Sequence, residues 1–188
     1  MTTINWHSTQ LIESFTYICG YCGKVVAPSQ GYFALSQSER IYICPFCSKP
    51  TFIGQNQQAP GAPFGNDVDY VPADVDSLYR EARRCMTVAA YTAAVLTCRK
   101  LLMHIAVAEG ADAGKAFTVY VDFLVNNFVT LKAYSWIDHI RKQSNKPNHE
   151  VVQMSQQDAQ EILAFSEMLL RLVYEFPHRI APVQTATT

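Results

Sequence analysis

The sequence predicts a mainly helical protein in which a small metal-stabilised β module precedes an antiparallel helical bundle. Three observations support this fold class. Four cysteines form two Cys-x-x-Cys pairs, strand-like alternation surrounds them, and a helical period of apolar residues fills the rest of the chain. We place the β module at residues 1–53, a linker at 54–72, the bundle at 73–180 and a loose tail at 181–188.

The two cysteine pairs have the spacing of a tetrahedral metal site. They read Cys19-Gly-Tyr-Cys22 and Cys44-Pro-Phe-Cys47. Each tight turn presents two thiolates, and two such turns at the tips of neighbouring hairpins close a four-sulfur site. We expect one Zn²⁺ with a structural role, because four thiolates leave no coordination position for water. An iron site of the rubredoxin type and disulfides are the alternatives that the spacing leaves open.

Size and charge restrict the classes of function that we expect for this chain. The chain has 188 residues, 49% apolar and 16% charged, with a net charge of -1. This composition is globular, and it creates no overall positive field that would attract nucleic acid or a membrane. Met1–Gln10 lacks the pattern of a secretory signal, and the longest uncharged stretch, Met86–Cys98, is too short to span a bilayer. We expect a cytoplasmic protein with no membrane partner, where reduced thiols favour a metal.

Alternating residues between Glu13 and Ile53 predict short strands. Tyr32 to Leu35 and Ile41 to Ile43 alternate on either side of a Ser-Gln-Ser-Glu turn. A module of about forty residues cannot build a large core, so metal binding should supply most of its folding free energy. Four aromatic residues of this module either form the small core or stack on bases, namely Tyr17, Tyr21, Tyr32 and Phe46.

A helical period follows the linker, which is rich in Gly, Pro, Gln and Asn. Apolar residues spaced three and four apart predict five helices, beginning near Asp74, Val88, Phe117, Trp136 and Ser155. The hydroxyl of Ser155 can cap the last helix, and Pro177 is expected to end it. Five helices with short connections form an antiparallel bundle.

Four stretches of the helical part carry a family pattern: CRKLLMHIAVAEGA (98–111), YVDFL (120–124), WIDHIRKQSNKPNHE (136–150) and DAQEILAFSEMLLRLVYEFP (158–177). They resemble a bacterial domain family of unknown function, found alone, behind zinc ribbons or attached to restriction-enzyme subunits. That family is regarded as a relative of the HEPN (higher eukaryote and prokaryote nucleotide-binding) domains. The resemblance implies a HEPN-like bundle, a homodimer or higher homo-oligomer, and a defence-system protein as a partner.

HEPN ribonucleases bring an arginine and a histidine from each protomer into a dimer cleft. Arg141 and His149, with Asn145 between them, stand in the corresponding segment here, at a wider spacing than in the nucleases. The resemblance implies a metal-independent endoribonuclease. His149 would act as general base or acid, Arg141 would bind the phosphate, and Lys142 and Lys146 would attract the RNA backbone.

Other hypotheses stay open beside the nuclease. The protein can be a non-catalytic accessory module that binds nucleic acid, a nucleotide or a protein, or a structural subunit whose ribbon mediates assembly. In these cases Asn145 caps a loop, His149 bonds a helix end, and Arg141 pairs with an acidic neighbour such as Glu150. Loss of RNA cleavage in Arg141→Ala would favour the nuclease, and salt-sensitive retention of nucleic acid without cleavage would favour the binding module.

Overall fold

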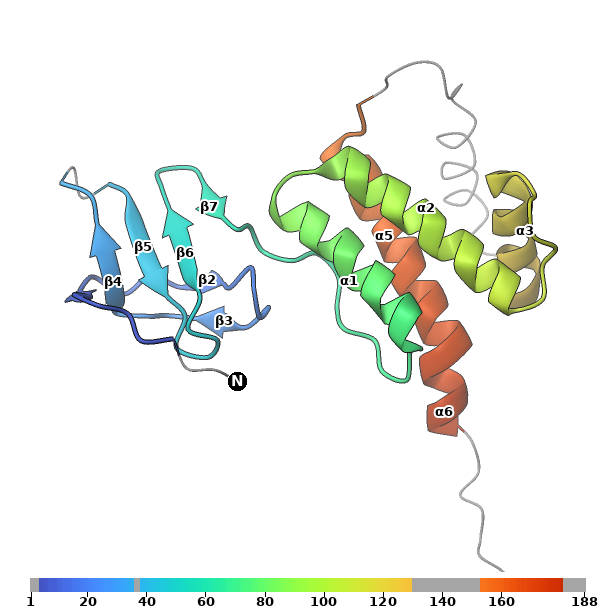
Figure 1. Cartoon of the computed structure of the whole chain (residues 1–188), viewed down its shortest axis with the longest axis horizontal. Helices are drawn as coiled ribbons and strands as arrows, with labels where there is room; N and C mark the ends of the chain where they lie inside the picture. Colours follow the sequence, from blue (N-terminus) through green and yellow to red (C-terminus); the bar gives the residue numbers. More distant parts are fainter. Residues whose placement is uncertain (1–3, 36–37, 130–152, 181–188) are drawn as a thin grey trace, which may run out of the picture. The chain divides into compact units, whose positions relative to one another are not determined.

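A small antiparallel β region precedes the helices, as the sequence predicts (Figure 1). The structure is a computed structural model and describes residues 4–35, 38–129 and 153–180. Contacts divide the chain into two compact units. The ribbon unit comprises Met1–Phe64 and Arg83–Ala90, and the helical unit comprises Gly65–Ala82 and Tyr91–Thr188.

The ribbon unit contains a five-stranded antiparallel sheet and a separate two-stranded sheet. The larger sheet has the order β1 (Gln10–Leu11), β4 (Gln30–Phe33), β5 (Arg40–Ile43), β6 (Pro50–Ile53) and β7 (Gln58–Ala59). The smaller sheet pairs β2 (Tyr17–Ile18) with β3 (Val25–Val26). Strands β4, β5 and β6 run side by side in Figure 1. Strand β7 lies within the stretch predicted as a linker.

Strand register determines which side chains form the small core of the ribbon unit. Tyr42 lies opposite Gly31 on one side and Thr51 on the other, and all three are buried. The core cluster consists of Tyr17, Cys19, Val26, Tyr42 and Cys44, and the half-buried Cys22 and Cys47 pack against it. Cysteine sulfurs therefore occupy the place that aliphatic side chains fill in a larger domain.

Gly31 permits the close approach of β4 to β5. A Cβ at this position would lie 1.9 Å from the carbonyl oxygen of Ile41, a backbone atom that cannot move without separating the strands. We therefore expect Gly31→Ala to destabilise the ribbon unit by roughly 2 kcal/mol or more, measured by thermal unfolding. Gly54→Ala is the matched control, because there the nearest atoms belong to the Phe52 ring, which can move. Equal losses in both variants would contradict this explanation.

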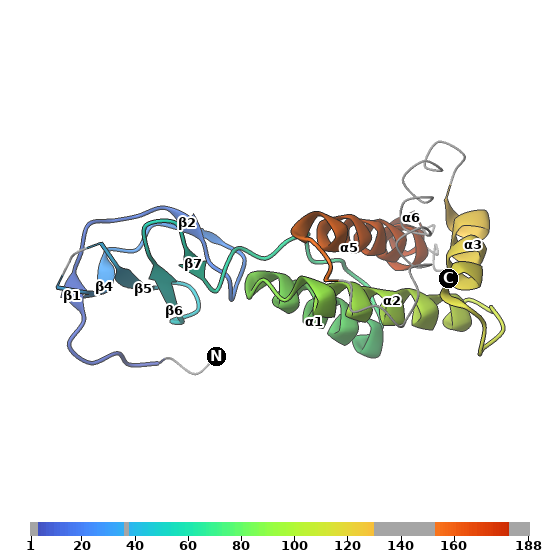
Figure 2. The ribbon, with the colours of Figure 1, turned by 90° about the horizontal axis from the view of Figure 1, so that it is seen from above.

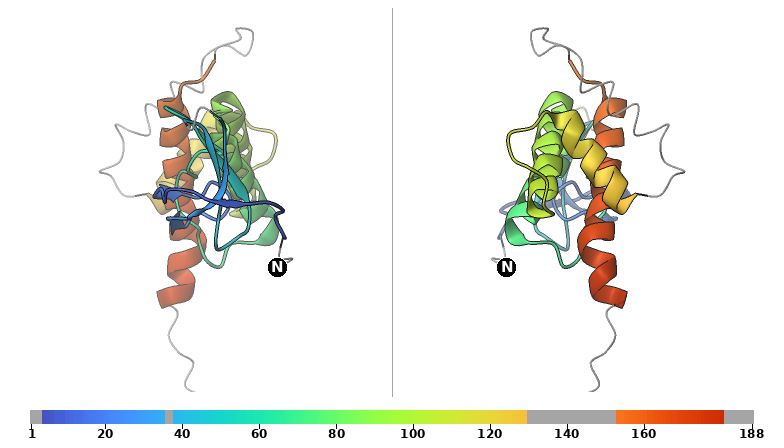
Figure 3. Two further views of the ribbon diagram at one scale, coloured as in Figure 1. Left: turned by 90° about the vertical axis from the view of Figure 1, so that its left-hand side faces the viewer. Right: turned by 90° about the vertical axis from the view of Figure 1, so that its right-hand side faces the viewer.

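The helical unit is built on a buried interface between α2 (Tyr91–Ala108) and α5 (Gln156–Leu170). Helix α3 (Phe117–Phe128) also contacts α2, and Figures 2 and 3 show it lying across the α2–α5 pair. Helix α1 (Ala73–Thr87) contributes the buried Val75 and Tyr79 to this unit. The predicted cap at Ser155 is confirmed, since its hydroxyl accepts the Asp158 N–H and the Asp158 carboxylate accepts the Ser155 N–H.

Two predicted helix boundaries were wrong. Helix α2 begins at Tyr91, not at Val88, because the N–H groups of residues 88–90 bond back to the end of α1 and Ala89 adopts a φ of 57°. The last helix does not end at Pro177. It passes through the π-helical turn η2 (Arg171–Glu175) into α6 (Phe176–Ile180), and this new segment places Pro177 in a first turn, where proline is tolerated.

By length and composition alone, helix α2 would pass as a membrane-spanning helix. Core helices of globular domains meet the same criterion. In this structure its apolar stripe is buried, with Val95, Cys98, Leu102 and Ile105 each at most 2% exposed. Helix α2 contacts both α3 and α5.

Candidate metal centre

The first cysteine pair forms a tight knuckle at the junction of β2 and β3. The N–H of Cys19 donates to the carbonyl of Lys24 at 2.9 Å, and the N–H of Gly23 donates to the carbonyl of Cys19 at 2.8 Å. Gly23 has a φ of 69°, a left-handed conformation that glycine adopts without a steric penalty. The Lys24 N–H points to the sulfur of Cys22. The knuckle therefore presents both sulfurs on one side of the turn.

The second cysteine pair repeats this geometry between β5 and β6. The N–H of Cys44 donates to the carbonyl of Lys49 at 3.0 Å, and the N–H of Ser48 donates to the carbonyl of Cys44 at 2.9 Å. Ser48 has a φ of 55°, which matches the glycine of the first knuckle. The Lys49 N–H points to the sulfur of Cys47. The two knuckles therefore have the same backbone structure.

The four sulfurs lie at the spacing of a tetrahedral metal centre. The Sγ–Sγ distance is 3.7 Å from Cys19 to Cys47 and 3.8 Å from Cys22 to Cys44, and all four Sγ atoms lie within 4.8 Å of one another. A metal with four sulfur ligands at about 2.3 Å requires tetrahedron edges of about 3.8 Å. All four cysteines are free. The four cysteines can therefore hold one metal ion. They are not paired in disulfides, which was the alternative.

Thiols at this spacing oppose one another's ionisation when no cation is bound. Burial raises the pKa of Cys47 to about 12, and the neighbouring sulfurs contribute to the rise. The hydrogen bond from the Lys49 N–H acts in the opposite direction but is weaker. Burial also raises the pKa of Cys22. At Cys44 burial acts in the same direction, but N–H groups of Cys47 and Phe46 outweigh it and lower the pKa. A divalent cation replaces the protons and stabilises all four thiolates together.

The left-handed residue of each knuckle leads us to expect different effects on metal affinity from two small substitutions. Gly23→Ala should weaken metal binding by roughly fivefold or more, because a side chain in the left-handed region costs about 1–2 kcal/mol. The new Cβ would only reach an ordinary contact, 3.6 Å from Pro63, so the backbone conformation alone causes the loss. Ser48→Gly should leave binding unchanged or strengthen it. Competition with a coloured chelator measures both, and a loss in both variants would contradict the equivalence of the knuckles.

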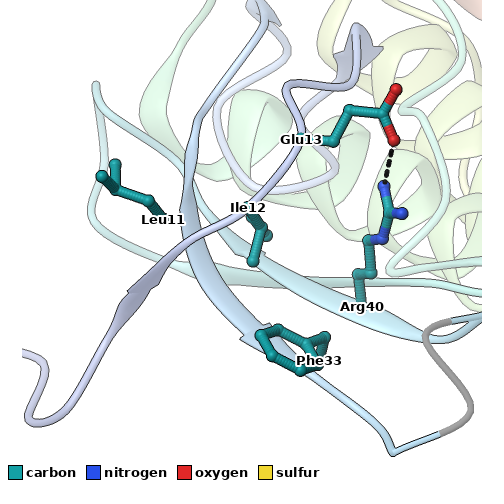
Figure 4. A pocket seen from close by; sticks show the side chains of 5 residues that line it. All are labelled: Leu11, Ile12, Glu13, Phe33 and Arg40. Carbon is teal, nitrogen blue, oxygen red and sulfur yellow. Dashed lines mark hydrogen bonds and ion pairs between the residues drawn. The ribbon is translucent and has the colours of Figure 1, made fainter.

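Two depressions lie in the ribbon unit away from the sulfur cluster or beside it. One of about 260 Å³ is lined by Leu11, Ile12, Phe33 and the ion pair of Glu13 with Arg40, whose charged atoms are 3.3 Å apart (Figure 4). A larger one of about 570 Å³ lies beside the second knuckle, between the N-terminal segment and residues 43–48. Neither is lined by a histidine, and no group of nucleophile and base converges in them.

The structure brings together all four cysteines that the sequence predicts as metal ligands, and they could hold a metal ion. The other predicted site residues, Arg141, Lys142, Asn145, Lys146 and His149, lie outside the residues that the structure describes. The predicted fourth helix near residue 136 also lies there.

Two further residues escaped the sequence interpretation. Lys24 and Lys49 each follow the second cysteine of a pair by two positions, and their backbone groups fix the knuckles. The shared pattern Cys-x-aromatic-Cys-x-Lys was readable in the sequence as an internal repeat of the two knuckles.

Comparison with known proteins identifies the helical part. Residues 80–186 match the family described as a domain of unknown function (DUF4145). The chain belongs to the DUF4145 family. The match covers more than half of the chain and begins after the four clustered cysteines, so the ribbon precedes the DUF4145 region. No curated protein and no solved structure matches the chain.

Proposed function

We propose that Cys19, Cys22, Cys44 and Cys47 bind one structural Zn²⁺, and that this DUF4145 protein acts through binding surfaces and not through chemistry at the metal. The observation that carries the proposal is the pair of Sγ–Sγ distances of 3.7 and 3.8 Å, which fit a tetrahedron of four thiolates. Four protein ligands complete this coordination. A water molecule, which catalytic zinc requires, has no position left.

Zinc is favoured over iron by affinity and not by geometry. Both metals accept four thiolates in a tetrahedron, so the sulfur distances suit either. Divalent zinc lies above divalent iron in the general order of affinities for such sites.

Elemental analysis of the full chain, purified under reducing conditions, tests the proposal. We expect close to one zinc per chain, no visible absorption band, and four thiols that react only after the metal is removed. An iron content close to one with visible sulfur-to-iron absorption would replace zinc by iron. A metal-free protein with rapidly reacting thiols would contradict the metal centre itself.

The endoribonuclease hypothesis remains a second proposal, supported by the HEPN resemblance of the helical part. It assigns catalysis to His149 and Arg141, with Asn145 in the same segment, and requires a homodimer that brings two copies together. The purified protein should then cleave RNA without added magnesium and leave cyclic phosphate ends. Arg141→Ala and His149→Ala should abolish cleavage, whereas His139→Ala, a neighbouring histidine with no assigned role, should not. Intact RNA after prolonged incubation would contradict the hypothesis.

A further inference from the structure

We propose that the two metal knuckles form a platform for single-stranded nucleic acid. Tyr21 and Phe46 would stack on bases, and Lys24 and Lys49 would contact the phosphate backbone. This inference rests on the proposed function, since the bound metal holds the two knuckles together. It also deepens that function, because it names the class of partner that the ribbon unit would bind.

The first observation is that both knuckles expose an aromatic ring at the same position. Tyr21 and Phe46 each precede the second cysteine of a pair, and they are 54% and 56% exposed. Large aromatic side chains normally supply the core of so small a module. Here other rings do so, since Tyr17 and Tyr42 are buried and Phe15 stacks on both. The rings of Tyr21 and Phe46 are therefore not needed for the core and remain on the surface.

The second observation is that each ring is accompanied by a lysine at an equivalent position. Lys24 and Lys49 are exposed. The Lys24 ammonium lies 4.3 Å from the centre of the Phe46 ring, so a cation of one knuckle contacts the aromatic residue of the other. Phe46 nevertheless keeps more than half of its surface exposed, which leaves room for a second partner. The backbone bonds of both lysines to Cys19 and Cys44 hold these groups on rigid turns.

The combination of charges and rings decides between kinds of partner. Residues 19–24 and 44–49 contain no acidic side chain, so both charged side chains of the knuckles are positive. An acidic peptide would use the lysines and leave the rings in water, and an apolar protein surface would cover the rings and leave the lysines unpaired. A single strand of nucleic acid uses both, because bases stack on aromatic faces and phosphates attract cations.

Fluorescence anisotropy with labelled twelve-nucleotide U and T strands tests the proposal and separates RNA from DNA. We expect salt-sensitive binding by the full metal-loaded chain. Tyr21→Ala and Phe46→Ala should each weaken binding about fivefold or more, the loss expected for one stacked base. Lys24→Gln combined with Lys49→Gln should reduce the slope of log affinity against log salt by about 1.4, since each phosphate contact contributes about 0.7 for single strands.

Matched variants separate stacking from a general loss of apolar surface. Tyr21→Phe keeps a ring and should bind as well as the wild type. Phe46→Leu keeps an apolar side chain but no ring, and should bind as weakly as Phe46→Ala. Phe33→Ala removes an exposed ring from strand β4 of the larger sheet and should change nothing.

Metal content, measured on the same samples, separates failure of this inference from failure of the proposed function. Metal-loaded protein that binds neither strand at low salt would overturn the platform and leave the zinc centre standing. Unchanged binding in Phe46→Leu or in Tyr21→Ala combined with Phe46→Ala would also overturn it, because the strand would then bind without stacking on these rings. Wild-type protein without metal would instead contradict the proposed function.

Discussion

Cys44→Ser is expected to unfold the ribbon unit and to leave the helical unit folded. Cys44 is 1% exposed and belongs to the core cluster of Tyr17, Val26 and Tyr42. Structural zinc sites of this kind contribute about 10–16 kcal/mol of apparent binding free energy, which is comparable to the whole stability of a small domain. Amide hydrogen exchange should therefore show loss of protection in β4, β5 and β6 and unchanged protection in α2 and α5.

Cys85→Ser is the matched control for this prediction. Cys85 is half-buried and, within the described residues, does not belong to a cluster able to bind a metal. Its replacement should leave the exchange of the ribbon strands unchanged. A strong chelator should reproduce the effect of Cys44→Ser in the wild type, and zinc should reverse it. Full protection of β4 to β6 after complete metal removal would contradict the role of the metal as the core.

Arg171→Met is expected to destabilise the helical unit by about 3 kcal/mol or more. Arg171 donates to Glu175 at 2.8 Å and to Glu167 at 2.9 Å, and Glu175 is only 2% exposed. Methionine keeps an apolar stem of similar length, so the loss reports on charge and hydrogen bonds more than on volume. Arg179 still contacts Glu175 at 2.6 Å, which limits the loss. Chemical denaturation measures it.

The pH dependence of stability gives this prediction a second readout. Burial alone would raise the pKa of Glu167, but the N–H of Asn66 and the Arg171 guanidinium outweigh it and lower the pKa. A carboxyl whose pKa is lower in the folded state stabilises the protein above its ordinary pKa of about 4.5, and this contribution disappears as the pH falls through the folded value. Arg171→Met should therefore be less sensitive to acid in this range than the wild type.

Arg80→Met provides the comparison within the same unit. Arg80 is about half exposed and pairs with Asp76 at 2.7 Å, four residues away on α1. Exposed pairs of this kind contribute about 0–1 kcal/mol, so this variant should lose little stability. If Arg171→Met lost no more than Arg80→Met, the charged cluster around Glu175 would not stabilise the fold as we argue.

The cysteine cluster of the candidate metal site was predictable because each of its pairs is local in the sequence. Cys19 and Cys22, like Cys44 and Cys47, are brought together by one turn each, and the spacing alone identifies them. The cap at Ser155 was readable for the same reason, with Asp158 three residues later. These features depend on neighbours in the chain, and a pattern of residue types describes them completely.

The wrong predictions depend on backbone geometry that residue types do not reveal. Val88 has helical spacing, but Ala89 adopts a positive φ, which an alanine gives no reason to expect. Pro177 was expected to end the helix, but the wider η2 turn before it starts a new helical segment. Strand β7 forms in a stretch without strand-like alternation because β6 supplies its hydrogen-bond partners.

X-ray absorption at the metal edge of the purified full chain tests the central claim most directly. We expect a zinc signal with four sulfur neighbours at about 2.3 Å and no nitrogen or oxygen bound to the metal. Cys22→Ser should change this shell to three sulfurs and one lighter atom, or lose the metal. A wild-type spectrum with nitrogen or oxygen ligands, or with fewer than four sulfurs, would contradict a metal centre made of Cys19, Cys22, Cys44 and Cys47.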